Sequence, residues 1–102
     1  MITILKSTEQ GLETLAEFTA GSWINVIDPT PAEITQLSQT LAIPQDFITD
    51  SLDVDELARS EKEGNVALII LRIPYIQAKD ADIPYITIPL GIILTDQYAV
   101  TV

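Results

Sequence analysis

The feature that most limits how this chain can fold is residues 52–75, where a charged segment runs directly into an apolar one. The first part is dense in Asp and Glu with two balancing bases, whereas residues 66–73 are apolar apart from Arg72. A short apolar run rich in β-branched residues predicts a buried strand. Because both of its faces are apolar, we expect this strand to be central in a sheet and to end at Pro74.

Turn residues and alternating apolar positions predict the other strands. Gly64 and Asn65 both tolerate the positive φ of a tight turn, which predicts a hairpin between Arg59–Glu63 and the apolar strand. Pro89 and Gly91 predict a bend and a bulge within their strand, since proline cannot donate to a ladder. Alternation predicts further strands at residues 1–6, 23–27, 85–94 and 98–102.

Two helices are predicted between these strands. Thr30, Pro31 and Glu33 have the spacing of a capping box with proline at the first helical position. Pro44 ends this helix and can open a second one. The first helix should bury Ile34, Leu37 and Leu41, and the second should bury Phe47, Ile48 and Leu52.

The predicted fold class is α/β, with a mixed parallel and antiparallel sheet of about six strands, and the two helices in one block are expected to cover one face of it. The 102 residues suit one domain. The chain stops at its last predicted strand with no helix to follow, so we expect a truncated domain. Residues 11–18 fit either a short strand or a helical turn.

Composition excludes several classes of function. The net charge of −10 argues against nucleic acid and against an anionic membrane surface, because both attract Lys and Arg. The absence of Cys and His removes disulfides, thiol nucleophiles and the usual zinc ligands. Any bound metal would have only oxygen ligands, which favours a hard cation such as Mg²⁺ or Ca²⁺.

The acids of residues 50–56 do not form a calcium loop. An EF-hand that starts at Asp53 needs Gly at its sixth position and Glu at its twelfth, but Ala58 and Gly64 stand there. We therefore interpret these acids as partners of Arg59 and Lys62 on a solvated face. Trp23 lies on a predicted strand, where core packing is the more common role.

Asp80 and Asp82 form a second acidic pair, beside Lys79 in a polar loop. Two carboxylates at this spacing can bind a hydrated Mg²⁺ weakly, because Mg²⁺ keeps most of its waters. A solvated hairpin loop without a ligand explains the same residues.

Three segments together resemble the N-terminal cytoplasmic domain of the CorA-type magnesium transporters. They are WINVIDPTPAEI at residues 23–34, IPQDFITDSLDVDELARSEKEGNVALIILRIP at 43–74, and IPLGIILTDQYAVTV at 88–102. The motif residues within them are Trp23, Thr30, Glu33, Leu52, Asp53, Glu56, Arg59, Glu61, Pro89, Gly91, Thr101 and Val102. No single motif is specific, and their order and spacing carry the match.

The resemblance implies the regulatory domain of a homopentameric channel for Mg²⁺, with Co²⁺ and Ni²⁺ as further ions, at the cytoplasmic face of the cell membrane. The membrane-spanning part is absent from these 102 residues, so the chain cannot itself conduct ions. The resemblance places a weak, metal-sensing carboxylate in the loop after the buried strand, at Asp80 or Asp82. The resemblance also implies an α/β/α-type sandwich. Asp53, Glu56, Arg59 and Glu61 match the family's pattern, and we interpret them as a structural salt-bridge group in which Arg59 pairs with the acids.

Two other functions fit the same sequence. An acidic protein-interaction module without a metal role needs only the charged surface. A metal-dependent enzyme with oxygen ligands needs a deep pocket with convergent acids, and no catalytic motif is present. We expect no enzyme activity.

Overall fold

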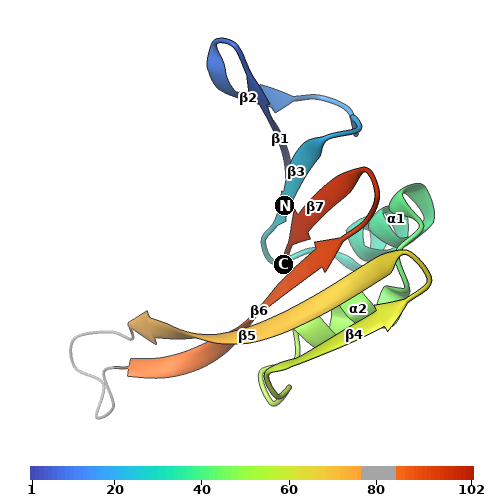
Figure 1. The fold of residues 1–102 in the computed structure, drawn as a ribbon. Coiled ribbons are helices and arrows are strands. Elements are labelled where there is room, and N and C mark those ends of the chain that lie inside the picture. Colours follow the sequence, from blue (N-terminus) through green and yellow to red (C-terminus); the bar gives the residue numbers. More distant parts are fainter. Residues whose placement is uncertain (77–84) are drawn as a thin grey trace.

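The computed structural model describes residues 1–76 and 85–102 (Figure 1). The elements are β1 (Ile2–Thr8), β2 (Gly11–Leu15), β3 (Ser22–Val26), α1 (Pro31–Leu41), α2 (Gln45–Ser51), β4 (Arg59–Glu63), β5 (Val66–Ile76), β6 (Tyr85–Leu94) and β7 (Tyr98–Thr101).

All seven strands form one sheet in the order β2-β1-β3-β7-β6-β5-β4. The pair β3–β7 is parallel and the other five pairs are antiparallel. The predicted α/β class with a mixed sheet is therefore confirmed, with seven strands in place of about six. The additional strand is β2, which settles the ambiguous residues 11–18 in favour of a strand.

The first helix begins where its capping signals predict. The N–H of Glu33 donates to Thr30 Oγ1 (3.2 Å), and the N–H of Thr30 donates to Glu33 Oε1 (2.9 Å). Each bond satisfies a backbone donor that has no partner within the helix. The helix ends at Ala42, whose φ of 55° is left-handed and cannot continue it.

Both helices pack on the same face of the sheet (Figure 1). Their buried residues meet alternate residues of the strands, because strand side chains point to opposite faces in turn. The core consists of Ile4, Ile24, Val26, Leu37, Leu41, Ile43, Phe47, Ile48, Leu68, Ile70, Ile93 and Val100.

Two predicted core residues are exposed. Leu52, expected to point inward, follows the end of α2 and is 40% exposed. Trp23 is also 40% exposed, because its neighbours Ile24 and Val26 point toward the helices and the alternation sends Trp23 to the other face. Among the described residues, no helix covers that other face (Figure 1).

The prediction of a central place for β5 is wrong. The strand lies next to the last one, between β6 and the edge strand β4. It also continues through Pro74 to Ile76, still paired with β6. Pro74 is tolerated because it lies opposite Thr87 in a non-hydrogen-bonded pair. In such a pair the backbone N–H and C=O groups of both residues point away from the neighbouring strand, so no hydrogen bond between β5 and β6 is lost.

The predicted bulge at Gly91 is also wrong. The register of β5 and β6 runs without a break through ten consecutive residue pairs. Gly91 instead lets α2 approach the sheet, since a Cβ at this position would lie 1.9 Å from Ser51 Oγ. The glycine reflects close packing of a helix rather than a change in the ladder.

Candidate functional site

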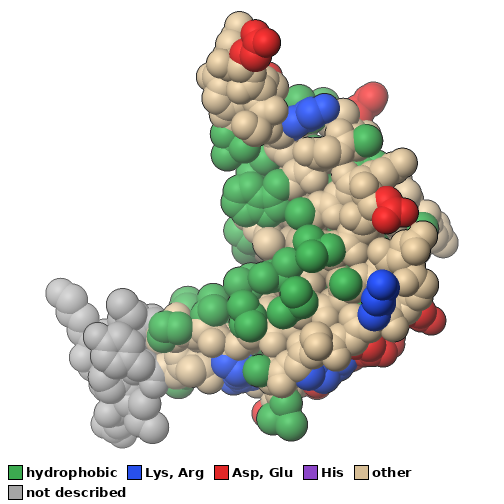
Figure 2. Space-filling model, in the orientation of Figure 1, with side chains coloured by type: hydrophobic (Ala, Val, Ile, Leu, Met, Phe, Trp, Pro, Cys, Tyr) green, Lys and Arg blue, Asp and Glu red, His purple; other side chains and the backbone are tan. Residues whose placement is uncertain are grey.

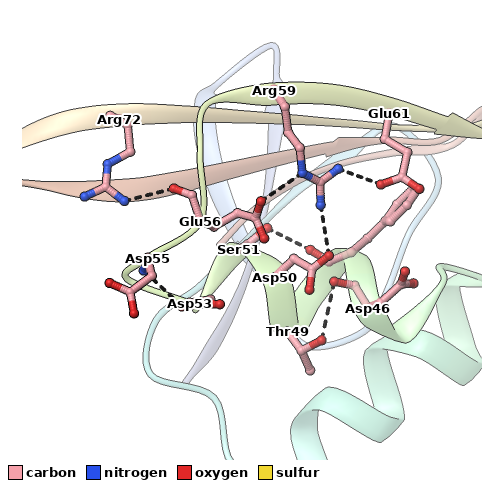
Figure 3. A network of polar contacts seen from close by, with 11 residues as sticks. Asp46, Thr49, Asp50, Ser51, Asp53, Asp55, Glu56, Arg59, Glu61 and Arg72 are labelled. Carbon is pink, nitrogen blue, oxygen red and sulfur yellow. Dashed lines mark hydrogen bonds and ion pairs between the residues drawn. The ribbon is translucent and has the colours of Figure 1, made fainter.

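Arg59, the first residue of β4, lies at the centre of a network of carboxylates (Figure 3). Its Nη2 is 2.9 Å from Asp50 Oδ2, its Nε is 2.9 Å from Glu56 Oε1, and its Nη1 is 2.6 Å from Glu61 Oε2. These carboxylates come from α2, from the loop after α2, and from β4. One guanidinium therefore joins three parts of the chain.

The charges of this network are unbalanced, since three carboxylates share one guanidinium. Hydrogen bonds to Glu56 and then Glu61 raise the pKa of Arg59 above its ordinary value, so it stays protonated. Partial burial raises the pKa of Asp50, and repulsion from Glu56 adds to that effect. Each of these two effects exceeds the attraction of Arg59, which by itself would lower the pKa of Asp50.

Arg72 on β5 fixes the same acidic loop from another side (Figure 3). Its Nη1 donates to the carbonyl oxygens of Val54 (2.7 Å) and Glu56 (3.1 Å). Its Nη2 donates to the carbonyl oxygen of Thr87 on β6 (2.7 Å). These bonds satisfy backbone acceptors of the loop. The loop between α2 and β4 is thus held by two arginines, and Leu57 at its tip is 76% exposed.

The predicted salt-bridge group consisted of Asp53, Glu56, Arg59 and Glu61. The structure brings the last three together. Asp53 lies apart, where its Oδ1 accepts a hydrogen bond from the N–H of Asp55 (2.9 Å) and closes a turn. The salt-bridge group did not name Asp50, which was covered only by the broader interpretation of the acids of residues 50–56 as partners of Arg59 and Lys62. Asp50 lies three residues after the buried Phe47 on α2. That helical spacing places Asp50 beside the buried face and could have indicated its contact with the sheet.

The predicted metal-binding residues, Asp80 and Asp82, lie outside the described residues, in the segment that joins β5 to β6. Within residues 1–76 and 85–102, no group of three or more His, Cys, Asp or Glu side chains is arranged to hold a metal ion. Among the described residues, three carboxylates gather around Arg59, and each of them already accepts a hydrogen bond from its guanidinium.

A hollow of about 480 Å³ lies between the end of α1 and the turn before β7. Its acidic lining residues are Glu63 and Asp96, accompanied by Asn65 and Thr40. A metal-dependent enzyme needs several acids that converge on one point, and this hollow supplies only these two.

In the part of the chain that the structure describes, no helix is long and apolar enough to cross a membrane.

Comparison with known proteins agrees with this fold. A family model described as "CorA-like Mg²⁺ transporter protein" matches residues 19–102. No curated protein sequence matches the chain.

Two solved structures from Methanocaldococcus jannaschii share the fold. The complete CorA magnesium transporter matches 99% of the chain at 25% identity, with a TM-score of 0.78. The soluble domain of CorA matches 99% of the chain at 25% identity, with a TM-score of 0.77. The chain spans 31% of the complete transporter and 39% of the soluble domain. Because the family model matches most of the chain, this protein belongs to the CorA-like Mg²⁺ transporter family.

Proposed function

We propose that the chain is the N-terminal cytoplasmic domain of a CorA-like channel for Mg²⁺, where it senses the intracellular ion and regulates the channel. Co²⁺ and Ni²⁺ are further candidate ions. In this proposal other residues of the whole protein form the conducting part, and the whole protein assembles as a homopentamer. The domain meets the membrane only through that conducting part.

The agreement with the soluble domain of a CorA transporter carries this proposal. It extends over 99% of the chain, with a TM-score of 0.77. The likeness therefore includes all three segments on which the sequence resemblance rests.

We propose Asp80 and Asp82 as the sensing carboxylates. Mg²⁺ binds through one or two carboxylates while it keeps several waters, so a pair at this spacing is sufficient for weak binding. The competing carboxylates around Arg59 are less available, because the guanidinium occupies them. A metal ion there would have to displace a bound positive charge.

Binding of Mg²⁺ to the chain itself tests this assignment. Thermal unfolding is measured with MgCl₂ and with NaCl at equal ionic strength, which separates binding from screening. Mg²⁺ at about ten times its dissociation constant stabilises the folded chain by about 1.4 kcal/mol. The double variant Asp80→Asn/Asp82→Asn should lose this difference.

The variant Asp53→Asn/Asp55→Asn is the matched control. It removes the same two charges at the same spacing, and the amide oxygen that it introduces at position 53 can still accept the bond that closes the turn. This control should keep the response to Mg²⁺. An equal response in the Asp80→Asn/Asp82→Asn variant would show that the sensing site lies elsewhere.

An acidic protein-interaction module is the alternative function. One observation favours it, the exposed Leu57 on an acidic loop that two arginines hold in place. The reading frame after Val102 discriminates the two functions. Two apolar spans of about 20 residues, with Gly-Met-Asn near the end of the first, would support the channel. A stop codon directly after Val102 would exclude the channel.

A further inference from the structure

The outer parts of β5 and β6, residues 71–76 and 85–90, form a two-stranded ribbon that projects from the sheet (Figure 1). β4 pairs with β5 only through Val66–Ile70, and β7 pairs with β6 only through Ile92–Leu94. A two-stranded ribbon alone is marginally stable in water. The position of the ribbon therefore depends on the side chains that fasten its base to the rest of the chain.

Arg72 lies at the base of the ribbon, on the face of the sheet that the helices cover. Leu68 and Ile70 on the same strand are buried toward the helices, and the alternation of a strand sends Arg72 to that side as well. The neighbour of Arg72 there is the loop of residues 52–58, which joins α2 to β4. Arg72 is therefore placed between the ribbon and this loop.

The Arg72 guanidinium makes five hydrogen bonds, one for each of its N–H groups. In addition to the bonds described above, Nη2 (3.1 Å) and Nε (3.3 Å) both donate to the hydroxyl Oγ1 of Thr87. Because Thr87 belongs to β6, one side chain fastens both strands of the ribbon to the loop. A lysine, which donates from a single nitrogen atom, cannot reproduce this set of bonds.

Glu56 joins Arg72 to the network around Arg59 (Figure 3). Its carbonyl oxygen accepts a hydrogen bond from Arg72 Nη1 (3.1 Å), and its carboxylate Oε1 accepts one from Arg59 Nε (2.9 Å). Arg59 also donates to Asp50 on α2 through Nη2 (2.9 Å). A continuous series of polar contacts thus runs from the ribbon, through the two arginines, to α2.

The two arginines hold different parts of the loop. Arg72 donates to its backbone carbonyl oxygens, whereas Arg59 donates to the carboxylate of Glu56. Figure 2 shows basic side chains in blue beside acidic ones in red along the lower border of the molecule. Because the backbone carries the side chain, a shift of the loop backbone at Glu56 must also move the carboxylate that Arg59 binds.

We propose that Arg72 couples the position of the ribbon to the network around Arg59. A displacement of the ribbon moves the Glu56 backbone through Arg72, and thereby changes the contact of Arg59 with α2. A ligand or partner that displaced the ribbon would in this way act on α2, at the other end of the series. The coupling does not depend on the proposed channel, because every contact in it lies within the described residues.

Hydrogen exchange at the Nε–H group of Arg59, measured by NMR on a ¹⁵N-labelled chain, tests the coupling. Arg59 and Arg72 are the only arginines, so Arg72→Lys leaves a single guanidinium Nε–H signal, that of Arg59. Thr87→Val removes an acceptor of Arg72 on the ribbon without changing the loop. Thr14→Val is the matched control, because it makes the same change at an exposed position on β2, the strand farthest from β4. Far-UV circular dichroism establishes that each variant is folded.

Arg72→Lys should speed exchange at the Arg59 Nε–H at least about fivefold, because the loop that carries Glu56 opens more often once its backbone bonds are lost. Thr87→Val should speed it at least about twofold in the parent chain and have no effect in the Arg72→Lys chain, because its influence passes through Arg72. The Thr14→Val control should exchange as the parent does. The proposal is overturned if Arg72→Lys leaves the Arg59 rate unchanged, or if Thr87→Val changes that rate equally, or not at all, in both chains.

Discussion

The close approach of α2 to the sheet at Gly91 gives the sharpest test of the fold. In Gly91→Ala, the new Cβ would lie 1.9 Å from Ser51 Oγ and 2.4 Å from Ser51 Cβ. Favourable contacts between carbon atoms lie at about 3.5–4.0 Å, so helix and strand must separate by roughly 1 Å. Because α2 carries the fully buried Phe47 and Ile48, this separation disturbs the centre of the core.

The expected loss follows from the same contacts. Overpacking a core costs about 1–3 kcal/mol, and burial of a side chain such as Phe47 or Ile48 contributes about 1.5–3 kcal/mol. We expect Gly91→Ala to lower the free energy of unfolding by roughly 3–5 kcal/mol, a large share of the about 5–15 kcal/mol typical of a domain. Urea unfolding followed by far-UV circular dichroism measures this loss.

A double-mutant cycle with Ser51→Gly identifies the cause of the loss. Ser51→Gly removes both atoms that the new Cβ would meet, and by itself costs about 1 kcal/mol. The double variant should recover at least about 2 kcal/mol relative to the sum of the two single changes. Gly64→Ala is the control, since it places a methyl group in open space at a φ of 59°. A coupling energy near zero between positions 91 and 51 would refute the packing argument.

Three further predictions concern the helix cap and the arginine network. Thr30→Ala should lower the free energy of unfolding by about 1 kcal/mol, measured by urea unfolding. The Glu33 carboxylate accepts a hydrogen bond from the Thr30 N–H, and this bond lowers the pKa of Glu33. The ionised carboxylate therefore stabilises the folded chain fully above the ordinary pKa of Glu. This stabilisation is lost as the pH falls through the lowered pKa of the folded state. Glu33→Gln should therefore destabilise at pH 7 and converge with the parent once the pH falls below the lowered pKa of Glu33. Arg59→Met should destabilise at pH 7 more than Arg59→Lys, because methionine removes the positive charge that three carboxylates share and lysine keeps it, and urea unfolding measures both losses.

Local signals in the sequence predicted much of the fold. The capping box of Thr30 and Glu33, the turn at Gly64 and Asn65, and the alternation of β6 each depend on residues close in the chain. Alternation also assigned Trp23 to one side of its strand correctly. It could not tell which side the helices cover, so the exposure of Trp23 was predicted wrongly.

The wrong predictions concern contacts between distant segments. β5 is apolar on both faces, yet its place in the sheet depends on pairing with β6 and β4, which its own sequence does not encode. Gly91 suggested a bulge because its real neighbour, Ser51, lies forty residues away in the chain. Asp50 joined the network around Arg59 only through packing of α2 on the sheet.

Regulation by intracellular Mg²⁺ is the central claim, and ion flux through the whole transporter tests it most directly. The concentration of internal Mg²⁺ that closes the channel is measured for the parent, for Asp80→Asn/Asp82→Asn and for the control Asp53→Asn/Asp55→Asn. Our account predicts that closure in the first variant requires at least about tenfold more Mg²⁺, while the control closes as the parent does. Closure at the same Mg²⁺ concentration in all three proteins would contradict the proposed role of these carboxylates.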